Sequence, residues 1–411
     1  MRKYFYIFIF SLLAFILWQC SNPVSSPIQI NKNITASDKQ LVQSSRLFGL
    51  KLFKQVNQSA GDTNIFISPI SISTALGMVL NGANGKTYDE IKSTLELPGN
   101  TQEEINKSYK NLNNLLTQID PKVIFESANS IWYRQDVSFE QSFLNINKTY
   151  FDAEVQALNF ADPSAVNTIN NWVSEKTKQK ITGIIDRIPQ DAVMYLINAI
   201  YFKGTWLYKF DSTATKDDNF YVTPGNPVIC KMMDQKNKFD YYQSDNYQAI
   251  KLPYGNGDFE MLVILPSSGT DINSLINQMD DSYWNNLLAK MDSAEVNLWL
   301  PKFKIEYSIT LNDALKALGM TSAFDSTTAD FSNIRKGKDL FISRVLHKTY
   351  VKVDEEGTEA AGVTAVEFTR SSVSPGNNEV YMKINRPFIF AIRENSSGAI
   401  LFVGKVVNPN Q

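Results

Sequence analysis

Apolar residues in the first half of the chain recur at the spacing of helices, and short signals mark where three of these helices begin. Ser37-Asp38-Lys39-Gln40 has the form of a capping box, which pairs the free backbone N–H groups of a first helical turn. Ser68-Pro69 and Asp162-Pro163 each place a capping side chain before a proline, which is favoured at the first helical position. The periodic residues that follow these signals are Leu41, Ser45, Phe48, Leu52 and Val56, then Ile72, Ala75, Leu76 and Val79 up to Gly82, and then Val166, Ile169, Trp172 and Val173.

The last third of the chain has the patterns of strands. Phe259 to Leu265 is apolar except at Glu260, typical of a strand covered on both faces, and Gly255-Asn256-Gly257-Asp258 before it predicts a hairpin turn. Further strands are predicted at Val296 to Leu300, Pro301 to Ile305, Val345 to Val353, Phe388 to Arg393 and Ala399 to Val407. Helices that dominate early and strands that dominate late indicate an α+β fold in one large domain rather than regular βαβ repeats.

Composition and charge narrow the possible partners. The 411 residues are 43% hydrophobic, which is enough for a large core. The net charge is -2, and lysine and arginine are scattered along the chain, which argues against a nucleic-acid partner. We interpret the run around Lys107 and Lys110 as a solvated helix face rather than a polyanion site.

The N-terminus has the pattern of an export signal. Arg2-Lys3 precedes the apolar run Tyr4 to Trp18, which is too short for a comfortable membrane span, so residues 1–19 are predicted to be a signal peptide. Cys20 follows and resembles the cysteine that bacterial lipoproteins lipidate, although Trp18-Gln19 stands where that pattern has small residues. Residues 20–36 are then a tether, and 37–411 form the single folded domain. We expect an outer-membrane or cell-surface lipoprotein, with membrane contact only through the lipid, or alternatively plain secretion.

Few residues are available for catalysis or metal binding. Cys20 and Cys230 are the only cysteines, so the mature chain has no evident disulfide, and with one histidine they cannot form a usual zinc site. Any Ser-His-Asp or Cys-His arrangement would need His347, which lies in an alternating run and is interpreted as a hydrogen-bonded core residue. We expect no cofactor, no metal and no enzyme activity, and a hydrolase centred on His347 is the remote alternative.

One segment combines strand alternation with unusually small side chains. The side chains at Thr358, Ala360, Gly362, Thr364 and Val366 share one face, whereas Glu359 and Glu367 lie on the other. The segment can be read as an ordinary edge strand with a glycine turn, or as a strand able to slide between existing strands without burying bulk or charge. We call it the hinge segment, and its residues are Glu355, Glu356, Gly357, Thr358, Glu359, Ala360, Ala361, Gly362, Val363 and Thr364.

The hinge segment resembles the reactive-loop hinge of inhibitory serpins, and three further motifs follow the order of that family. Residues 64–72 resemble the segment that leads into the buried second serpin helix, and residues 198–206 resemble the end of a central-sheet strand. Residues 385–390 lie where the C-terminal signature is expected, so the resemblance spans Ser37 to Pro409. It implies a serpin fold, with helices packed around a large central mixed β-sheet and smaller sheets, and an exposed reactive loop.

The resemblance also implies roles for residues outside the hinge segment. In serpins the histidine that matches His347 belongs to a polar cluster beneath the central sheet, called the shutter, whose partners match Ser68, Ser71 and Asn198. Trp206 matches the tryptophan at the top of the sheet, where the loop first inserts.

The function implied is a single-use covalent trap for proteases. A protease would cut the reactive loop, and the severed hinge segment would then insert into the central sheet before the acyl-enzyme is hydrolysed. The expected partner is a serine protease, with cysteine proteases a further possibility, and we expect a monomer. The alternative is a noninhibitory serpin-fold binding protein that is cut as an ordinary substrate.

Two bonds are candidates for cleavage. Counting from Gly357 with the usual serpin loop length gives Ser371–Ser372, and a loop one residue shorter gives Arg370–Ser371. Arg370 is the only basic residue of the loop before Lys383 and suits a trypsin-like pocket with a buried carboxylate, although it also has a plain role in keeping the loop soluble. Phe368 and Val373 leave chymotrypsin-like or elastase-like targets open.

Overall fold

The computed structural model describes residues 34–97, 99–337, 339–358 and 379–411, which all belong to one compact unit, residues 32–411. The predicted signal peptide, Cys20 and most of the predicted tether lie outside the described residues, as do Glu359 to Thr364 of the hinge segment. The cleavage candidates Arg370, Ser371 and Ser372 lie outside them too.

The three predicted helices are confirmed, with small changes at their starts. The helix predicted from Ser37 is capped by Thr35, whose hydroxyl accepts from the Asp38 backbone while the Asp38 carboxylate accepts from the Thr35 N–H. The acidic partner of the capping box is therefore Asp38, three residues after Thr35, and Ser37 is not the cap. The helix after Asp162 begins at Ser164, whose N–H donates to the Asp162 carboxylate.

The described helices are α1 (Ala36–Ala60), α2 (Pro69–Leu80), α3 (Gly85–Thr94), α4 (Gln102–Gln118), α5 (Gln141–Phe151), α6 (Ser164–Lys176), α7 (Ile272–Gln278), α8 (Asp281–Ala289) and α9 (Asn312–Ala317). Within the described part of the chain, no helix combines the length and apolar character needed to cross a membrane.

The described strands form two sheets, and the α+β class is confirmed. One sheet has the order β1-β15-β14-β8-β7-β6-β9-β13 with β5 added beside β6, and the other has the order β10-β11-β12-β4-β2-β3. In the first sheet the strands are β1 (Ile65–Ile67), β5 (Lys216–Thr223), β6 (Asn226–Gln243), β7 (Tyr247–Tyr254), β8 (Phe259–Pro266), β9 (Asp292–Pro301), β13 (Val380–Lys383), β14 (Phe388–Glu394) and β15 (Ile400–Val406). In the second they are β2 (Val123–Arg134), β3 (Glu154–Leu158), β4 (Met194–Thr205), β10 (Phe303–Thr310), β11 (Leu346–Asp354) and β12 (Gly357–Thr358).

The strand predictions are confirmed to within a few residues. The run predicted at Phe259 to Leu265 is β8, which is buried along its whole length and joins β7 through the predicted hairpin turn. The other predicted strands are β9, β10, β11, β14 and β15. The long strands β2 and β6 were not anticipated, because polar residues interrupt their apolar residues: the polar ones are buried or half-buried in β2 and largely exposed in β6.

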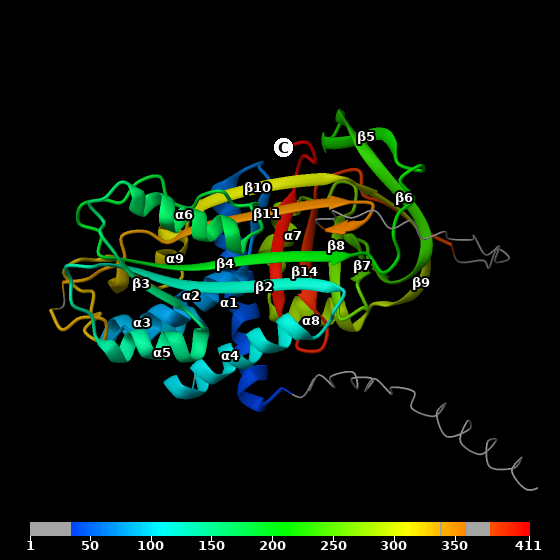
Figure 1. Cartoon of the computed structure of the whole chain (residues 1–411). Coiled ribbons are helices and arrows are strands. Elements are labelled where there is room, and N and C mark those ends of the chain that lie inside the picture. Colours follow the sequence, from blue (N-terminus) through cyan, green and yellow to red (C-terminus); the bar gives the residue numbers. More distant parts are fainter. Residues whose placement is uncertain (1–33, 98, 338, 359–378) are drawn as a thin grey trace, which may run out of the picture. The chain divides into compact units, whose positions relative to one another are not determined.

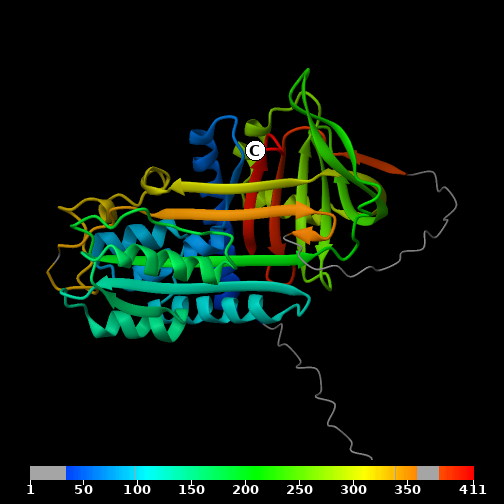
Figure 2. The same cartoon turned by 45° about the horizontal axis from the view of Figure 1, so that its top comes forward.

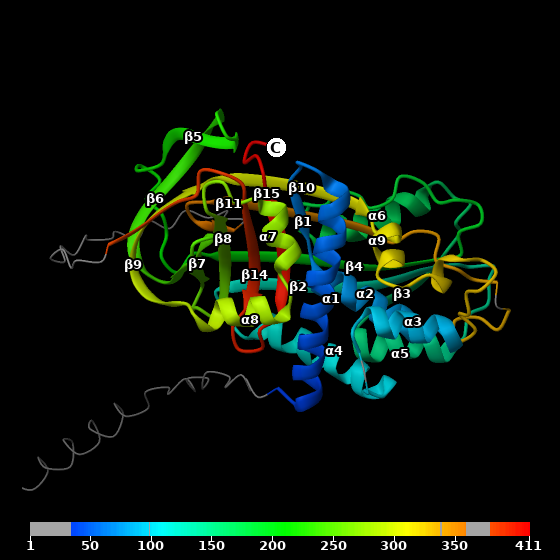
Figure 3. The same cartoon turned by 180° about the vertical axis from the view of Figure 1, so that it is seen from behind.

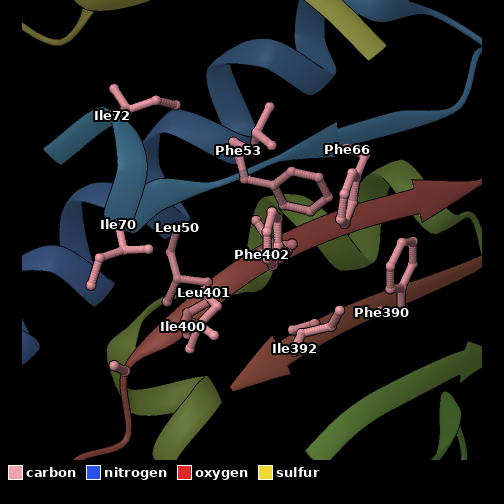
Figure 4. Packing of buried hydrophobic residues seen from close by; sticks show 14 of the residues in the cluster. Leu50, Phe53, Phe66, Ile70, Ile72, Phe390, Ile392, Ile400, Leu401 and Phe402 are labelled. Atoms are coloured by element: carbon pink, nitrogen blue, oxygen red, sulfur yellow. The ribbon is translucent and has the colours of Figure 1, made fainter. Parts of the chain in front are cut away.

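Three stacked aromatic rings join the N-terminal strand β1 to the C-terminal strands. Phe66 on β1 stacks on Phe402 of β15 with ring centroids 5.0 Å apart and on Phe390 of β14 at 5.5 Å, and all three rings are buried (Figure 4). Phe53 of α1 belongs to the same core, and Figure 3 shows α1 beside the end of the sheet that β1 and β15 form. Burying each such side chain contributes roughly 1.5–3 kcal/mol, so the two ends of the chain stabilise each other.

The six-stranded sheet contains long strands that run side by side, with α6 on one face and α2 on the other (Figure 1). A second apolar cluster, which includes Trp132, Ile169, Trp172 and Ile197, holds α6 against this sheet. The short strand β12 lies between β11 and β4 at one end of the sheet (Figure 2). Among the described residues, β4 and β11 are joined only through β12.

Candidate functional site

The start of the hinge segment is already a strand of the six-stranded sheet. Gly357 pairs with Asp354 of β11 and with Thr205 of β4, and both pairings are antiparallel. Thr358 in turn pairs with Val353 and Gly204. The chain therefore turns back after β11 and places two residues between the strands on either side.

Trp206 holds the turn that leads into β12. Its backbone N–H donates to the Glu356 carbonyl and its indole Nε1–H donates to the Asp354 carbonyl, both at 2.9 Å. Its ring stacks on Tyr254 with centroids 4.4 Å apart. The predicted tryptophan at the top of the sheet thus contacts the hinge segment directly through its backbone N–H, and its indole holds the end of β11 just before that segment.

The two residues of β12 fit a space that accepts only small side chains. A Cβ on Gly357 would lie 2.1 Å from the Gly204 carbonyl oxygen, and the φ angle of +154° also favours glycine there. Thr358 is 2% exposed, and its hydroxyl shares a hydrogen bond with the Tyr254 hydroxyl. Burial raises the pKa of Tyr254, so this phenol keeps its proton and the bond remains neutral.

Lysines pair with the carboxylates at the base of the hinge segment. Glu355 accepts from Lys302 Nζ at 2.7 Å and from the Thr215 hydroxyl at 2.8 Å, and Glu356 pairs with Lys209. Partial burial raises the pKa of Glu355, but the hydrogen bonds from Lys302 and Thr215 outweigh this, and its pKa lies below the usual value. These ion pairs hold Glu355 and Glu356 at the edge of the sheet, while the uncharged Gly357 and Thr358 enter it.

A second group of polar residues lies where the start of β11 meets the start of α2. His347 of β11 is buried, and its Nε2 accepts from the Ser68 backbone N–H at 3.0 Å. The Ser68 hydroxyl accepts from the Ser71 N–H and donates to the Leu401 carbonyl at 2.7 Å. The interpretation of His347 as a hydrogen-bonded core residue is confirmed, and three of the four predicted shutter residues are connected.

Asn198, the fourth predicted shutter residue, bonds elsewhere. Its Nδ2 donates to the Ser127 hydroxyl and to Asn129 Oδ1, both on the neighbouring strand β2. Counting from the pairing of β12, Asn198 lies six residues before Gly204, and His347 lies six residues before Val353. The two residues therefore face each other at the same level of β4 and β11, but the described atoms form no hydrogen bond between them.

The chemistry around His347 does not provide a nucleophile and a base. A base would need a free ring nitrogen beside a hydroxyl, but Nε2 already accepts a backbone N–H and the Ser68 hydroxyl already donates to a carbonyl. Burial lowers the pKa of His347 to about 3, so the ring is neutral at physiological pH. Among the residues that the structure describes, no cluster of three His, Cys, Asp or Glu side chains could hold a metal ion.

Acidification should destabilise the protein through His347. The unfolded chain binds a proton at this residue below about pH 6.5 whereas the folded chain does not until about pH 3, so stability falls as the pH falls through this window. From pH 7 to pH 5 we expect a loss of about 2 kcal/mol from this residue alone. Urea unfolding of the wild type and of His347→Gln at both pH values checks this, because glutamine offers an oxygen to the Ser68 N–H but does not titrate. An equal pH dependence in the two proteins would contradict it.

Several residues of this site carry no signal in the sequence. Tyr254, Phe210, Lys302 and Lys209 contact the hinge segment from distant parts of the chain. A tyrosine or lysine at the end of a strand has no distinctive pattern, so only the tertiary structure identifies these partners. Gly204 lies inside the motif at residues 198–206, but its role as the close neighbour of Gly357 was not anticipated.

Comparisons with known proteins place this geometry in a family. The family model described as "Serpin (serine protease inhibitor)" matches residues 43–409. Human leukocyte elastase inhibitor is 35% identical over 386 residues, which cover 90% of this chain and all of that protein. An uncharacterized serpin-like protein of Thermococcus kodakarensis is 34% identical over 374 residues, covering 90% of this chain and 86% of the relative.

Two solved structures show the same fold. The thermophilic serpin tengpin in its native state has a TM-score of 0.82 at 33% identity, covering 92% of this chain and 95% of tengpin. Human thyroxine-binding globulin with its bound hormone also has a TM-score of 0.82, at 29% identity, covering 92% of this chain and all of that protein. The proteins similar to this chain therefore include one named as an elastase inhibitor and one named for binding thyroxine.

Proposed function

Because the chain belongs to the serpin family, we propose that it is a protease inhibitor that captures serine proteases in a single-use covalent trap. The observation that carries the proposal is β12, which places Gly357 and Thr358 between β11 and β4. Insertion of the hinge segment then needs no new nucleus, because the first two residues of the added strand are already paired on both sides. This is strand addition to a sheet.

In this mechanism the serine hydroxyl of the protease attacks the carbonyl carbon of one bond in the reactive loop. The C–N bond breaks, the hydroxyl proton passes to the leaving amine through the base of the protease, and the protease is left esterified to the residue before the cut. The chain before the cut then extends β12 between β4 and β11 and carries the protease with it. The chain after the cut begins the segment that includes β13, which is paired with β9.

The free energy of insertion makes the step effectively one-way. Each backbone hydrogen bond contributes on the order of 1 kcal/mol net, so a strand of about a dozen residues contributes about 10 kcal/mol. Burial of Val366 and Phe368 adds roughly 25 cal/mol per Å² of apolar surface. The insertion carries the attached protease away from the cleavage site before water can hydrolyse the ester that links it to the loop.

We further propose that the target is trypsin-like and that cleavage occurs after Arg370. Trypsin should form an adduct that survives denaturing electrophoresis, and mass spectrometry should find a released peptide that begins at Ser371. Replacing Arg370 with alanine should lower the rate of trypsin capture about 100-fold, because the buried carboxylate of the protease loses its partner. A peptide that begins at Ser372 would move the cut to the Ser371–Ser372 bond, and unchanged capture of trypsin by Arg370→Ala would contradict the trypsin-like preference.

The second candidate is a noninhibitory binding protein, which the similarity to thyroxine-binding globulin favours. The same gel separates the two functions. Complete cleavage of the loop by trypsin and by elastase, with both proteases fully active and no adduct, would support the binding protein and contradict the trap.

We also propose that the protein is exported and held at a membrane by a lipid on Cys20. Cells fed labelled palmitate should label the wild type and Cys230→Ser, whose thiol is buried, but not Cys20→Ser. The wild type should partition into the detergent phase of a Triton X-114 extraction and Cys20→Ser into the aqueous phase. Equal aqueous partition of both proteins would indicate plain secretion instead.

A further inference from the structure

A cavity of about 210 Å³ lies between β4 and β11, on the side of β12 where both strands begin. Its lining includes Ile72 and Ala75 from α2, Leu196 from β4, Leu346 from β11, and Ile184 from the segment after α6. The cavity therefore has walls from the two strands, a floor from α2 and a cover from the chain that follows α6. These side chains are apolar, so they offer no hydrogen bonds to water.

Two polar residues, Asn198 and His347, line this cavity at one level of β4 and β11. Asn198 Oδ1 is buried and unpaired within the described residues, and its Nδ2 donates to β2. The His347 ring is neutral and accepts at Nε2, so its proton is on Nδ1. The pair offers one acceptor and one donor from opposite strands.

We propose that this cavity binds a small neutral molecule with an apolar body and a hydroxyl group, and that the bound molecule regulates the trap. A hydroxyl both donates and accepts, so one such group can satisfy Asn198 Oδ1 and His347 Nδ1–H together. A carboxylate cannot donate to Asn198 Oδ1, and burying its charge beside a neutral imidazole is costly. A purely apolar molecule leaves both polar atoms unsatisfied.

The size of the cavity limits the ligand. A cavity of about 150 Å³ holds benzene, so this one suits a ring with a short chain, about eleven non-hydrogen atoms in all. The charged residues of the lining, Asp191, Asp339 and Arg344, come from the loops that precede β4 and β11, outside the two strands. The body of the ligand would lie along the starts of the two strands, with its hydroxyl between Asn198 and His347.

Regulation follows from the position of the cavity, and this part rests on the proposed function. The severed hinge segment must pass between the same two strands, so a molecule in the cavity delays complete insertion. Water then releases the acyl-enzyme before the protease is trapped, and the inhibitor is consumed as a substrate.

The direct test is binding of 4-phenylbutan-1-ol to the purified protein by calorimetry, with 4-phenylbutanoate as the matched anion. We expect one alcohol per chain with a dissociation constant on the order of 10–100 μM. The anion should bind at least about tenfold more weakly. Ala75→Leu fills the cavity from α2 and should abolish alcohol binding, whereas Ala289→Leu, the same change on the exposed end of α8, should not affect it.

Trypsin capture in the presence of the alcohol tests the regulatory part. Saturating alcohol should lower the captured fraction at least about threefold in the wild type and not in Ala75→Leu. Absence of saturable binding, equal binding to Ala75→Leu, or equal binding of the anion would overturn the inference. If trypsin forms adducts without the alcohol and the alcohol does not bind, only this inference fails. If the alcohol binds in an Ala75-dependent manner and no adducts form, the site stands and the proposed function fails.

Discussion

Replacing Thr358 with arginine will convert the protein from a trap into an ordinary substrate. The Thr358 side chain is 2% exposed and its hydroxyl bonds Tyr254, so an arginine there must either bury a guanidinium without a carboxylate partner or leave the sheet. An unpaired buried charge costs several kcal/mol, and the side chain will therefore keep β12 out of the gap. Without β12 the severed loop has no paired start from which to extend.

The measurement is the ratio of adduct to cleaved inhibitor when trypsin is mixed with each variant. We expect this ratio to fall at least about tenfold in Thr358→Arg, because even 1.4 kcal/mol lost from insertion slows it by that factor relative to deacylation. Thr358→Ser keeps the hydroxyl and the small volume and should behave like the wild type. Thr223→Arg makes the same change at an exposed end of β5 and should also leave the ratio unchanged.

The opposite outcome would show that β12 is not the nucleus of insertion. If Thr358→Arg captured trypsin as efficiently as the wild type, the hinge segment would have to insert without its first two pairings. Gly357→Ala offers a second test, because its Cβ would meet the Gly204 carbonyl oxygen at 2.1 Å and no charge is involved. It should lower the ratio as well.

Local signals in the sequence predicted much of the fold. The pair Ser68-Pro69 starts α2 as expected, because a capping hydroxyl and a proline act within a single turn. The apolar run of β8, interrupted only by Glu260, was also sufficient, since it is typical of a strand covered on both faces. The cap of α1 was misplaced by two residues, because both candidate caps have an acceptable partner three residues later. Ser37 has Gln40 and Thr35 has Asp38.

The environment of the hinge segment could not be predicted in the same way. Tyr254 is 104 residues from Thr358, and Lys302 is 53 residues from Glu355. No periodicity relates positions so far apart, because their contact depends on how whole strands pair. The family resemblance pointed to Ser68, Ser71, Asn198, His347 and Trp206. It did not predict that β4 and β11 are separated, or that Asn198 bonds to the neighbouring strand β2.

Cleavage of the reactive loop will raise the melting temperature of the protein. Of the described residues, β4 and β11 pair only through the two residues of β12, so along most of their length the edges that face each other have no described strand partner. A severed loop that fills this gap adds about 10 kcal/mol of stability. For a domain of this size, with unfolding entropy of about 2 cal/mol/K per residue, that gain raises the melting temperature by roughly 10 °C.

Controls separate insertion from the cut itself. Thr358→Arg should be cleaved at the same bond and should gain little, because its hinge segment cannot enter the sheet. The cavity variant Ala75→Leu tests whether the lower part of the gap is also filled, and a smaller gain in this variant than in Ala289→Leu is expected.

The most direct measurement is calorimetric melting of the intact protein and of the protein nicked in the reactive loop, at one concentration and in one buffer. We expect the nicked form to melt roughly 10 °C above the intact form. Equal melting temperatures for the two forms would mean that the severed segment gains nothing from the sheet, and would contradict the trap.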